Sequence, residues 1–115
     1  MEFMEADLFQ EGVRRVRDYV SALRWGSQLR DRAEAAGTPV ERKMKMLSEA
    51  SQMETSREAA MMGALEALLL LPKAPEKTAT LALVVEELSR LPRLTRKAQH
   101  GLARAKRALF ELRRH

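Results

Sequence analysis

The sequence predicts an all-α fold, a helical bundle built on a long antiparallel helical hairpin with two shorter C-terminal helices. Hydrophobic residues make up 45% of the chain and charged residues 32%, which is apolar enough for a core and typical of helical proteins. The chain contains no Ile and no Asn, and its valines do not alternate with polar residues as strands require. All four prolines lie between segments of helical periodicity. At 115 residues, we expect residues 1–115 to form a single domain.

The first helix is predicted over residues 7–36, with Asp7 near its start and Gly37 as its stop. Its first half carries one apolar stripe, formed by Phe9, Val13, Val16, Val20 and Leu23. The apolar residues of its second half, Ala22, Trp25, Leu29, Ala33 and Ala36, fall on nearly the opposite side. Either the helix breaks at Gly26, or one continuous helix presents two apolar surfaces. We favour the continuous helix, because a lone glycine costs a helix only about 1 kcal/mol.

The second helix is predicted over residues 39–71. Thr38-Pro39-Val40-Glu41 has the pattern of a capping box, with Thr38 as N-cap, Pro39 at the first helical position and Glu41 closing the box. A second possible capping box at residues 55–58 could split this helix. The apolar stripe consists of Met46, Ala50, Met53, Ala60, Met61, Ala64, Leu68 and Leu71. The short turn before it predicts an antiparallel hairpin.

The two remaining helices are predicted over residues 76–90 and 92–113, and we expect them to close the hairpin. The third helix has one apolar stripe, formed by Leu81, Val84, Val85, Leu88 and Leu91. The fourth helix has the most regular amphipathic pattern. Its apolar side is formed by Leu94, Ala98, Leu102, Ala105, Ala108, Leu109 and Leu112. Phe110 falls on its polar side, either as an anchor for a partner or as an end residue folded back.

Positive charge is concentrated at the C-terminal end of the chain. Residues 90–115 hold nine Lys/Arg against one acid, Glu111, although the net charge of the whole chain is only +5. The candidate binding residues on the polar face of the fourth helix are Arg93, Arg96, Lys97, His100, Arg104, Arg107 and Arg114. This face can be a solvated surface that complements the helix dipole, a docking site for an acidic protein, or a binding surface for DNA or RNA. Its Ala-rich apolar side disfavours binding to a membrane surface.

Self-association is predicted from the apolar residues that a single bundle would leave uncovered. The candidate interface residues are Trp25, Leu29, Met53, Leu68, Leu70 and Phe110. Residues 68–71 are apolar all round, so we expect other helices or a second chain to enclose them. The sequence thus predicts a homo-oligomer or a constitutive subunit of a larger protein assembly.

The sequence contains no motif for catalysis, so we predict no catalytic residue, no metal, no cofactor and no small-molecule substrate. There is no Cys, and the two histidines are His100 and His115, which leaves few agents for acid–base or metal chemistry. The apolar run 59–71 is too short to span a bilayer, and the N-terminus lacks a signal-peptide pattern. We therefore expect a cytoplasmic, non-enzymatic interaction module that acts as an adaptor, scaffold or assembly subunit, with DNA or RNA binding as the alternative.

Overall fold

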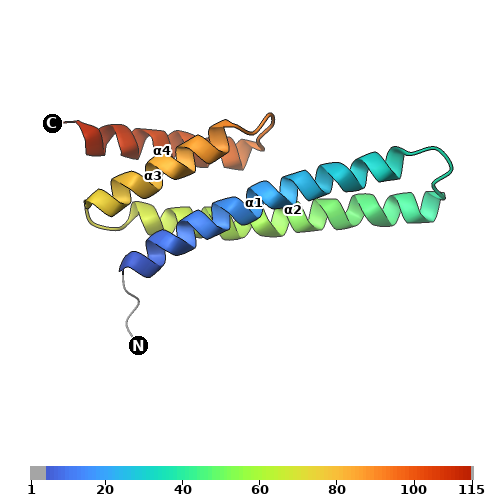
Figure 1. Ribbon diagram of the computed structural model, residues 1–115, viewed down its shortest axis with the longest axis horizontal. Helices are drawn as coiled ribbons and strands as arrows, with labels where there is room; N and C mark the ends of the chain where they lie inside the picture. Colours follow the sequence, from blue (N-terminus) through green and yellow to red (C-terminus); the bar gives the residue numbers. More distant parts are fainter. Residues whose placement is uncertain (1–4, 115) are drawn as a thin grey trace.

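The computed structural model describes residues 5–114, which form four helices and, within that range, no strand. The helices are α1 (Glu5–Glu34), α2 (Val40–Leu69), α3 (Pro75–Ser89) and α4 (Arg96–Arg113). Helices α1 and α2 form the long antiparallel hairpin, and α3 and α4 pack on one half of it (Figure 1). The predicted all-α bundle built on a helical hairpin is therefore confirmed, although α3 and α4 close only part of the hairpin.

The hairpin turn is built differently from the predicted capping box. Gly37 adopts a φ of 85°, the left-handed conformation that glycine tolerates best, and it forms the turn. Helix α1 already ends at Glu34, two residues before the predicted end at residue 36. The hydroxyl of Thr38 donates to the carbonyl of Arg32 at 3.1 Å, which satisfies an acceptor at the end of α1. Pro39 takes the N-cap position of α2, and no side chain caps that helix. The capping box was wrong because the Thr38 hydroxyl bonds to the preceding helix.

Both long helices are continuous. Helix α1 passes through Gly26 without a break, as we favoured, and α2 is not split at residues 55–58. Gly26 faces α2, where a Cβ would overlap the carboxylate of Glu54. That carboxylate accepts two hydrogen bonds from Arg30, at 2.8 and 2.5 Å. The missing side chain at Gly26 therefore makes room for a bidentate ion pair between the two helices.

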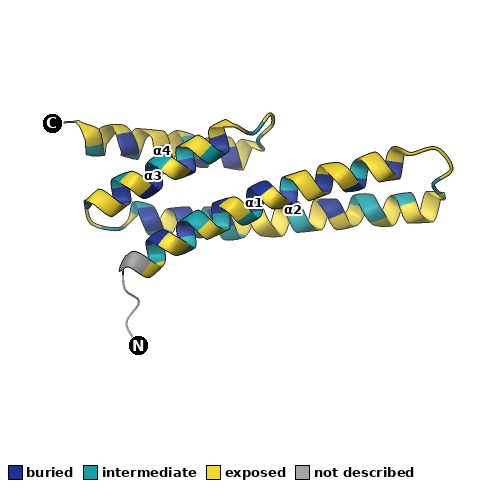
Figure 2. Cartoon of the chain, viewed as in Figure 1, coloured by how far each residue is buried: buried dark blue, intermediate teal, exposed yellow. Residues whose placement is uncertain are grey.

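The hydrophobic core lies where α3 and α4 cover the hairpin (Figure 2). Its buried members are Phe9, Val16, Tyr19, Met61, Leu65, Leu68, Leu81, Val84, Leu88, Ala98, Ala105 and Leu109. Gly101 lets α4 approach α2 closely, since a Cβ there would lie 2.8 Å from the sulfur of Met62. The small residues of α4 thus set its distance from the hairpin.

Helix α3 is joined to α2 by a buried lysine. Lys77 is 8% exposed, and its Nζ donates to the carbonyl oxygens of Leu69 at 3.0 Å and Leu71 at 2.6 Å. These carbonyls lie at the C-terminal end of α2, where a cation is favoured by the helix dipole. Lys77 therefore fixes the turn between the two helices.

Helix α4 begins at Arg96 rather than at Pro92, so residues 92–95 belong to the loop. Thr95 is the N-cap: its hydroxyl oxygen accepts a hydrogen bond from the amide of Ala98 at 3.1 Å. The same hydroxyl donates to Glu58 of α2. The predicted start was wrong because Thr95 supplies a side-chain cap that proline lacks.

The end of the hairpin next to its turn is not covered by α3 or α4 (Figure 1). We call residues 31–53 the arm, because Arg30 and Glu54 are the last hairpin residues beside the loop between α3 and α4. Within the arm only Ala33 and Ala50 are buried. The arm is therefore a pair of helices with a thin core of small side chains.

Candidate functional site

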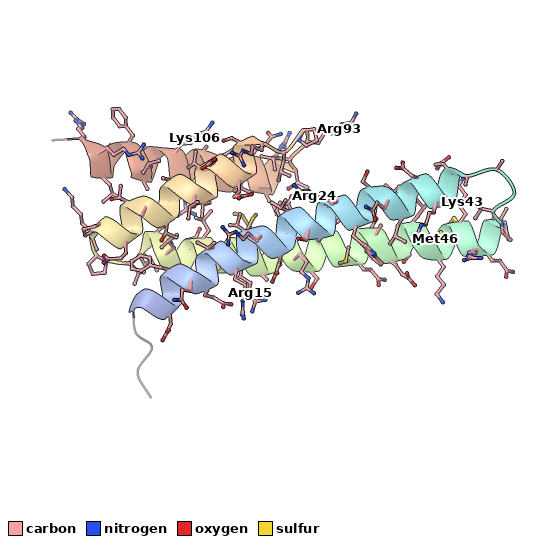
Figure 3. The ribbon with its side chains drawn as sticks, in the orientation of Figure 1. Arg15, Arg24, Lys43, Met46, Arg93 and Lys106 are labelled. Atoms are coloured by element: carbon pink, nitrogen blue, oxygen red, sulfur yellow. The ribbon has the colours of Figure 1, made fainter. Side chains whose placement is uncertain are left out.

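The basic face of α4 points away from the rest of the molecule. The opposite side of the helix is buried through Ala98, Gly101, Ala105 and Leu109. All seven predicted binding residues are exposed, namely Arg93, Arg96, Lys97, His100, Arg104, Arg107 and Arg114. Arg93 lies in the loop before the helix, and Lys106 adds a further exposed cation farther along it (Figure 3). The amphipathic pattern thus predicted correctly which side of α4 faces solvent.

Little of this charge is neutralised within the chain. Arg104 forms an ion pair with Glu66 of α2, so that residue is committed to the contact between α4 and the hairpin. Among the residues that the structure describes, Arg93, Arg96, Lys97, Arg107 and Arg114 form no ion pair. The outer face of α4 therefore keeps a surplus of positive charge that is available to a partner.

Phe110 is an aromatic residue inside this basic face. Its side chain is 65% exposed, so it is not folded back onto the core. Its neighbours one turn before, Lys106 and Arg107, and Arg113 after it are exposed cations, and the adjacent Glu111 is an exposed acid. An exposed aromatic ring surrounded by cations offers apolar contact and charge in the same place, as the anchors of protein interfaces do.

A cleft of about 780 Å³ opens between α1 and the loop that joins α3 to α4. Four arginines line it, namely Arg24, Arg30, Arg90 and Arg93. Two of them are paired, because Arg30 binds Glu54 and Arg90 binds Glu86 at 2.5 Å. Figure 3 shows Arg24 on α1 near the loop that carries Arg93. Glu54 and Glu87 also line the cleft, so Arg24 and Arg93 are its cations without an ion pair in the described chain, and the sequence did not indicate this cleft.

The six predicted interface residues separate into two groups. Trp25, Leu70 and Phe110 are exposed, at 44%, 84% and 65%, and Met53 is half-buried. Leu29 and Leu68 are buried within the chain, at 6% and 0% exposure. Both were misplaced at the surface, since Leu29 packs inside the hairpin and Leu68 belongs to the main core. The expected enclosure of residues 68–71 holds for Leu68 and fails for Leu70.

A buried tyrosine is a perturbed group that the sequence did not reveal. Tyr19 is 1% exposed, and its hydroxyl has no hydrogen-bond partner among the described residues. Burial raises the pKa of Tyr19, the carboxylate of Glu58 raises it further, and the nearby hydroxyl of Thr95 opposes the shift only in part. The ring lies inside the core, so it supports packing and is not open to a substrate.

The described part of the chain holds neither a metal cluster nor a membrane-spanning helix. Residues 5–114 contain no cluster of three or more potential metal-ligating side chains, and His115 lies outside the described residues. None of the helices has an apolar stretch long enough to cross a bilayer. The chain matches no known protein family, no curated protein and no solved structure.

Proposed function

We propose that this chain is a non-enzymatic helical interaction module, acting as an adaptor, scaffold or assembly subunit, that self-associates and docks an acidic protein on the basic face of α4. The observation that supports docking is the exposed Phe110 ring amid cations that have no acidic partner in the described chain. Arginine and aromatic side chains supply most of the binding energy at protein interfaces. Surrounding positive charge accelerates encounter with an acidic surface.

DNA or RNA binding is the second candidate. It is supported by the row of exposed cations that runs from Arg93 in the loop through Arg96 and Arg107 to Arg114. Such a row can neutralise phosphates whatever the sequence of the nucleic acid. We favour an acidic protein because a large apolar ring at the C-terminal end of the face adds shape as well as charge to the recognition.

Selection from a peptide library tests the docking proposal. Wild-type protein serves as bait, and an Arg96→Glu/Arg107→Glu variant serves as counter-bait. We expect the enriched peptides to combine acidic residues with an apolar anchor, and to bind a Phe110→Ala variant at least about 10-fold more weakly. The matched control is Arg17→Glu/Lys45→Glu, which reverses two exposed cations on the hairpin and should leave peptide binding unchanged.

A duplex of about 20 base pairs provides the competing test. We expect binding in the micromolar range or weaker near physiological salt, as for a nonspecific basic surface. Nanomolar, sequence-selective binding that Arg96→Glu removes would establish the nucleic-acid role instead. Failure to enrich acidic peptides over neutral ones would contradict docking of an acidic protein.

A further inference from the structure

The arm needs more apolar contact than the chain itself provides. Its buried residues are Ala33 and Ala50, while Val40 and Met44 are exposed at 75% and 62%. Helices in proteins are stabilised mainly by packing of an apolar face, and small side chains provide little of it. Neither α3 nor α4 reaches the arm (Figure 1). Met44 lies nine residues from Met53 and so on the opposite side of α2. A second surface laid against the side that carries Met53 would add contact to the thin core formed by Ala33 and Ala50.

Trp25 and Met53 project from the side of the hairpin that faces away from α3 and α4. Arg30 and Glu54 point toward the loop between α3 and α4, and Trp25 lies about 140° from Arg30 around α1. On the other side, Arg32 and Met46 line one depression near the turn. Trp25 lies seven residues, or two helical turns, from Arg32, and Met53 lies seven from Met46, so both share that side.

We call this side of the hairpin the back face. Its central residues are Trp25 and Met53, and its flanking residues are Arg32, Met46, Glu49, Arg57 and Ala60. Trp25 and Met53 lie at the same level, because Gly26 and Glu54 directly oppose each other across the hairpin. Trp25, 44% exposed, is the largest apolar side chain on this face.

The charges of the back face are arranged with opposite signs on either side of its centre. On α1, Arg32 lies seven residues after Trp25. On α2, Glu49 lies four residues before Met53 and Arg57 lies four after it. Arg32, Glu49 and Arg57 form no ion pair within the described chain. When the face is rotated by 180° about an axis that runs across the hairpin at Met53, the position of Glu49 coincides with that of Arg57 in the unrotated face.

We propose that the back face binds a second copy of this chain, with the two hairpins antiparallel and related by a two-fold axis near Trp25 and Met53. In that arrangement α1 lies against α1 of the other copy, and α2 lies against its α2. Glu49 of each copy then meets Arg57 of the other copy. A two-fold interface requires exactly this kind of self-complementary patch.

The apolar residues match in the same arrangement. Met46 and Ala60 are equally spaced on either side of Met53, so each Met46 meets an Ala60 of the other copy. The two Trp25 rings lie close to the axis and become buried, as aromatic anchors at the centre of an interface do. This inference rests on the proposed self-association and assigns it to one surface, separate from the basic face of α4.

Sedimentation equilibrium of the full chain and its variants tests the assignment. We expect Trp25→Ala to raise the dimer dissociation constant at least about 30-fold, since the ring is a hot spot in both copies. Glu49→Arg and Arg57→Glu should each raise it about 10-fold, because each reversal opposes two like charges twice per dimer. The double variant Glu49→Arg/Arg57→Glu restores opposite charges and should return the constant to within about threefold of wild type.

Two control variants separate the back face from other surfaces. Phe110→Ala removes an exposed aromatic on α4, and Glu111→Arg makes the same change in charge as Glu49→Arg; neither should alter dimerisation. A wild-type dimer that is unaffected by Trp25→Ala, or is not restored by the double variant, would overturn the back-face assignment and leave self-association standing. A wild-type monomer at about 100 μM would overturn both.

Discussion

At the scale of single residues, polar side chains fix the ends of the helices. Lys77 holds two carbonyls at the end of α2, Thr38 holds one at the end of α1, and Thr95 caps α4 while bonding to Glu58. Each satisfies a backbone or side-chain group that the end of a helix leaves without a partner. These contacts determine where the chain turns and so where the basic face and the back face lie.

The buried lysine gives the first prediction. Lys77→Met removes two charged hydrogen bonds and the favourable interaction with the dipole of α2, so we expect the free energy of unfolding to fall by about 1.5–3 kcal/mol. Urea unfolding of Lys77→Met and of the wild type measures this fall in the free energy of unfolding. Lys97→Met, at an exposed position of α4, should change stability by less than about 0.5 kcal/mol. A Lys77→Met protein as stable as this control would show that the lysine is dispensable.

The buried tyrosine gives a prediction about pH. The folded-state pKa of Tyr19 is raised above 10.0, so its contribution to stability is complete below the unfolded pKa near 10 and is lost as pH rises through the folded pKa. Tyr19 is the only tyrosine in the chain, so tyrosinate absorbance reports it alone. We expect the Tyr19 hydroxyl to titrate above pH 10 in the folded protein and near pH 10 in urea. Stability of Tyr19→Phe should decline less steeply at alkaline pH. Titration at or below 10 in the folded state would contradict this.

At the scale of elements, hydrophobic periodicity predicted more than capping did. The stripes of α3, α4 and the first half of α1 marked buried faces, whereas the second stripe of α1 combines buried Leu29 and Ala33 with exposed Trp25 and Ala36. The start of α4 and the cap of α2 could not be predicted in the same way. Whether the hydroxyl of Thr38 or Thr95 forms a hydrogen bond with the helix before it or with the helix after it depends on the path of the loop. That path depends on packing.

For the candidate site, too, hydrophobic periodicity predicted which residues are exposed but not which residues they contact. The amphipathic pattern of α4 correctly placed its cations in solvent. It could not show that Arg104 pairs with Glu66, because those residues are 38 positions apart and meet only in the folded chain. Leu29 and Leu68 were misplaced because apolar residues on a second stripe can face either a neighbouring helix or solvent. Periodicity alone does not distinguish the two.

The arm supplies a prediction at this scale. Ala50 is fully buried between the two helices of the arm, so Ala50→Leu should force them apart and destabilise the protein by about 1–3 kcal/mol. Thermal unfolding followed by circular dichroism measures the loss. Ala59→Leu is the matched control, because Ala59 lies on the same helix and is exposed. Equal melting temperatures for the two variants would mean that the arm is not packed as described.

At the scale of the whole molecule, two different surfaces lie on opposite sides of the hairpin. Helices α3 and α4 pack on one side (Figure 1), and the back face lies on the other. A dimer through the back faces would therefore carry two outward basic faces. Such an arrangement presents two docking sites to one acidic assembly and increases overall affinity without any new contact.

The separation of the two surfaces leads to a further prediction. Arg96→Glu/Arg107→Glu should abolish binding of acidic peptides and leave the dimer dissociation constant unchanged, whereas Trp25→Ala should do the reverse. Peptide titration and sedimentation on the same samples measure both properties. If one variant changed both properties, the two surfaces would not be independent.

The central claim is that two copies bury the Trp25 side chains against each other. Trp25 is the only tryptophan in the chain and is 44% exposed in the single copy, so its fluorescence reports this surface directly. The decisive measurement is the emission maximum of the wild type on dilution from about 100 μM to about 0.1 μM. We predict a shift to longer wavelength as the dimer dissociates, at the concentration where sedimentation shows the mass to halve. An emission maximum that stays constant over this range would contradict the claim.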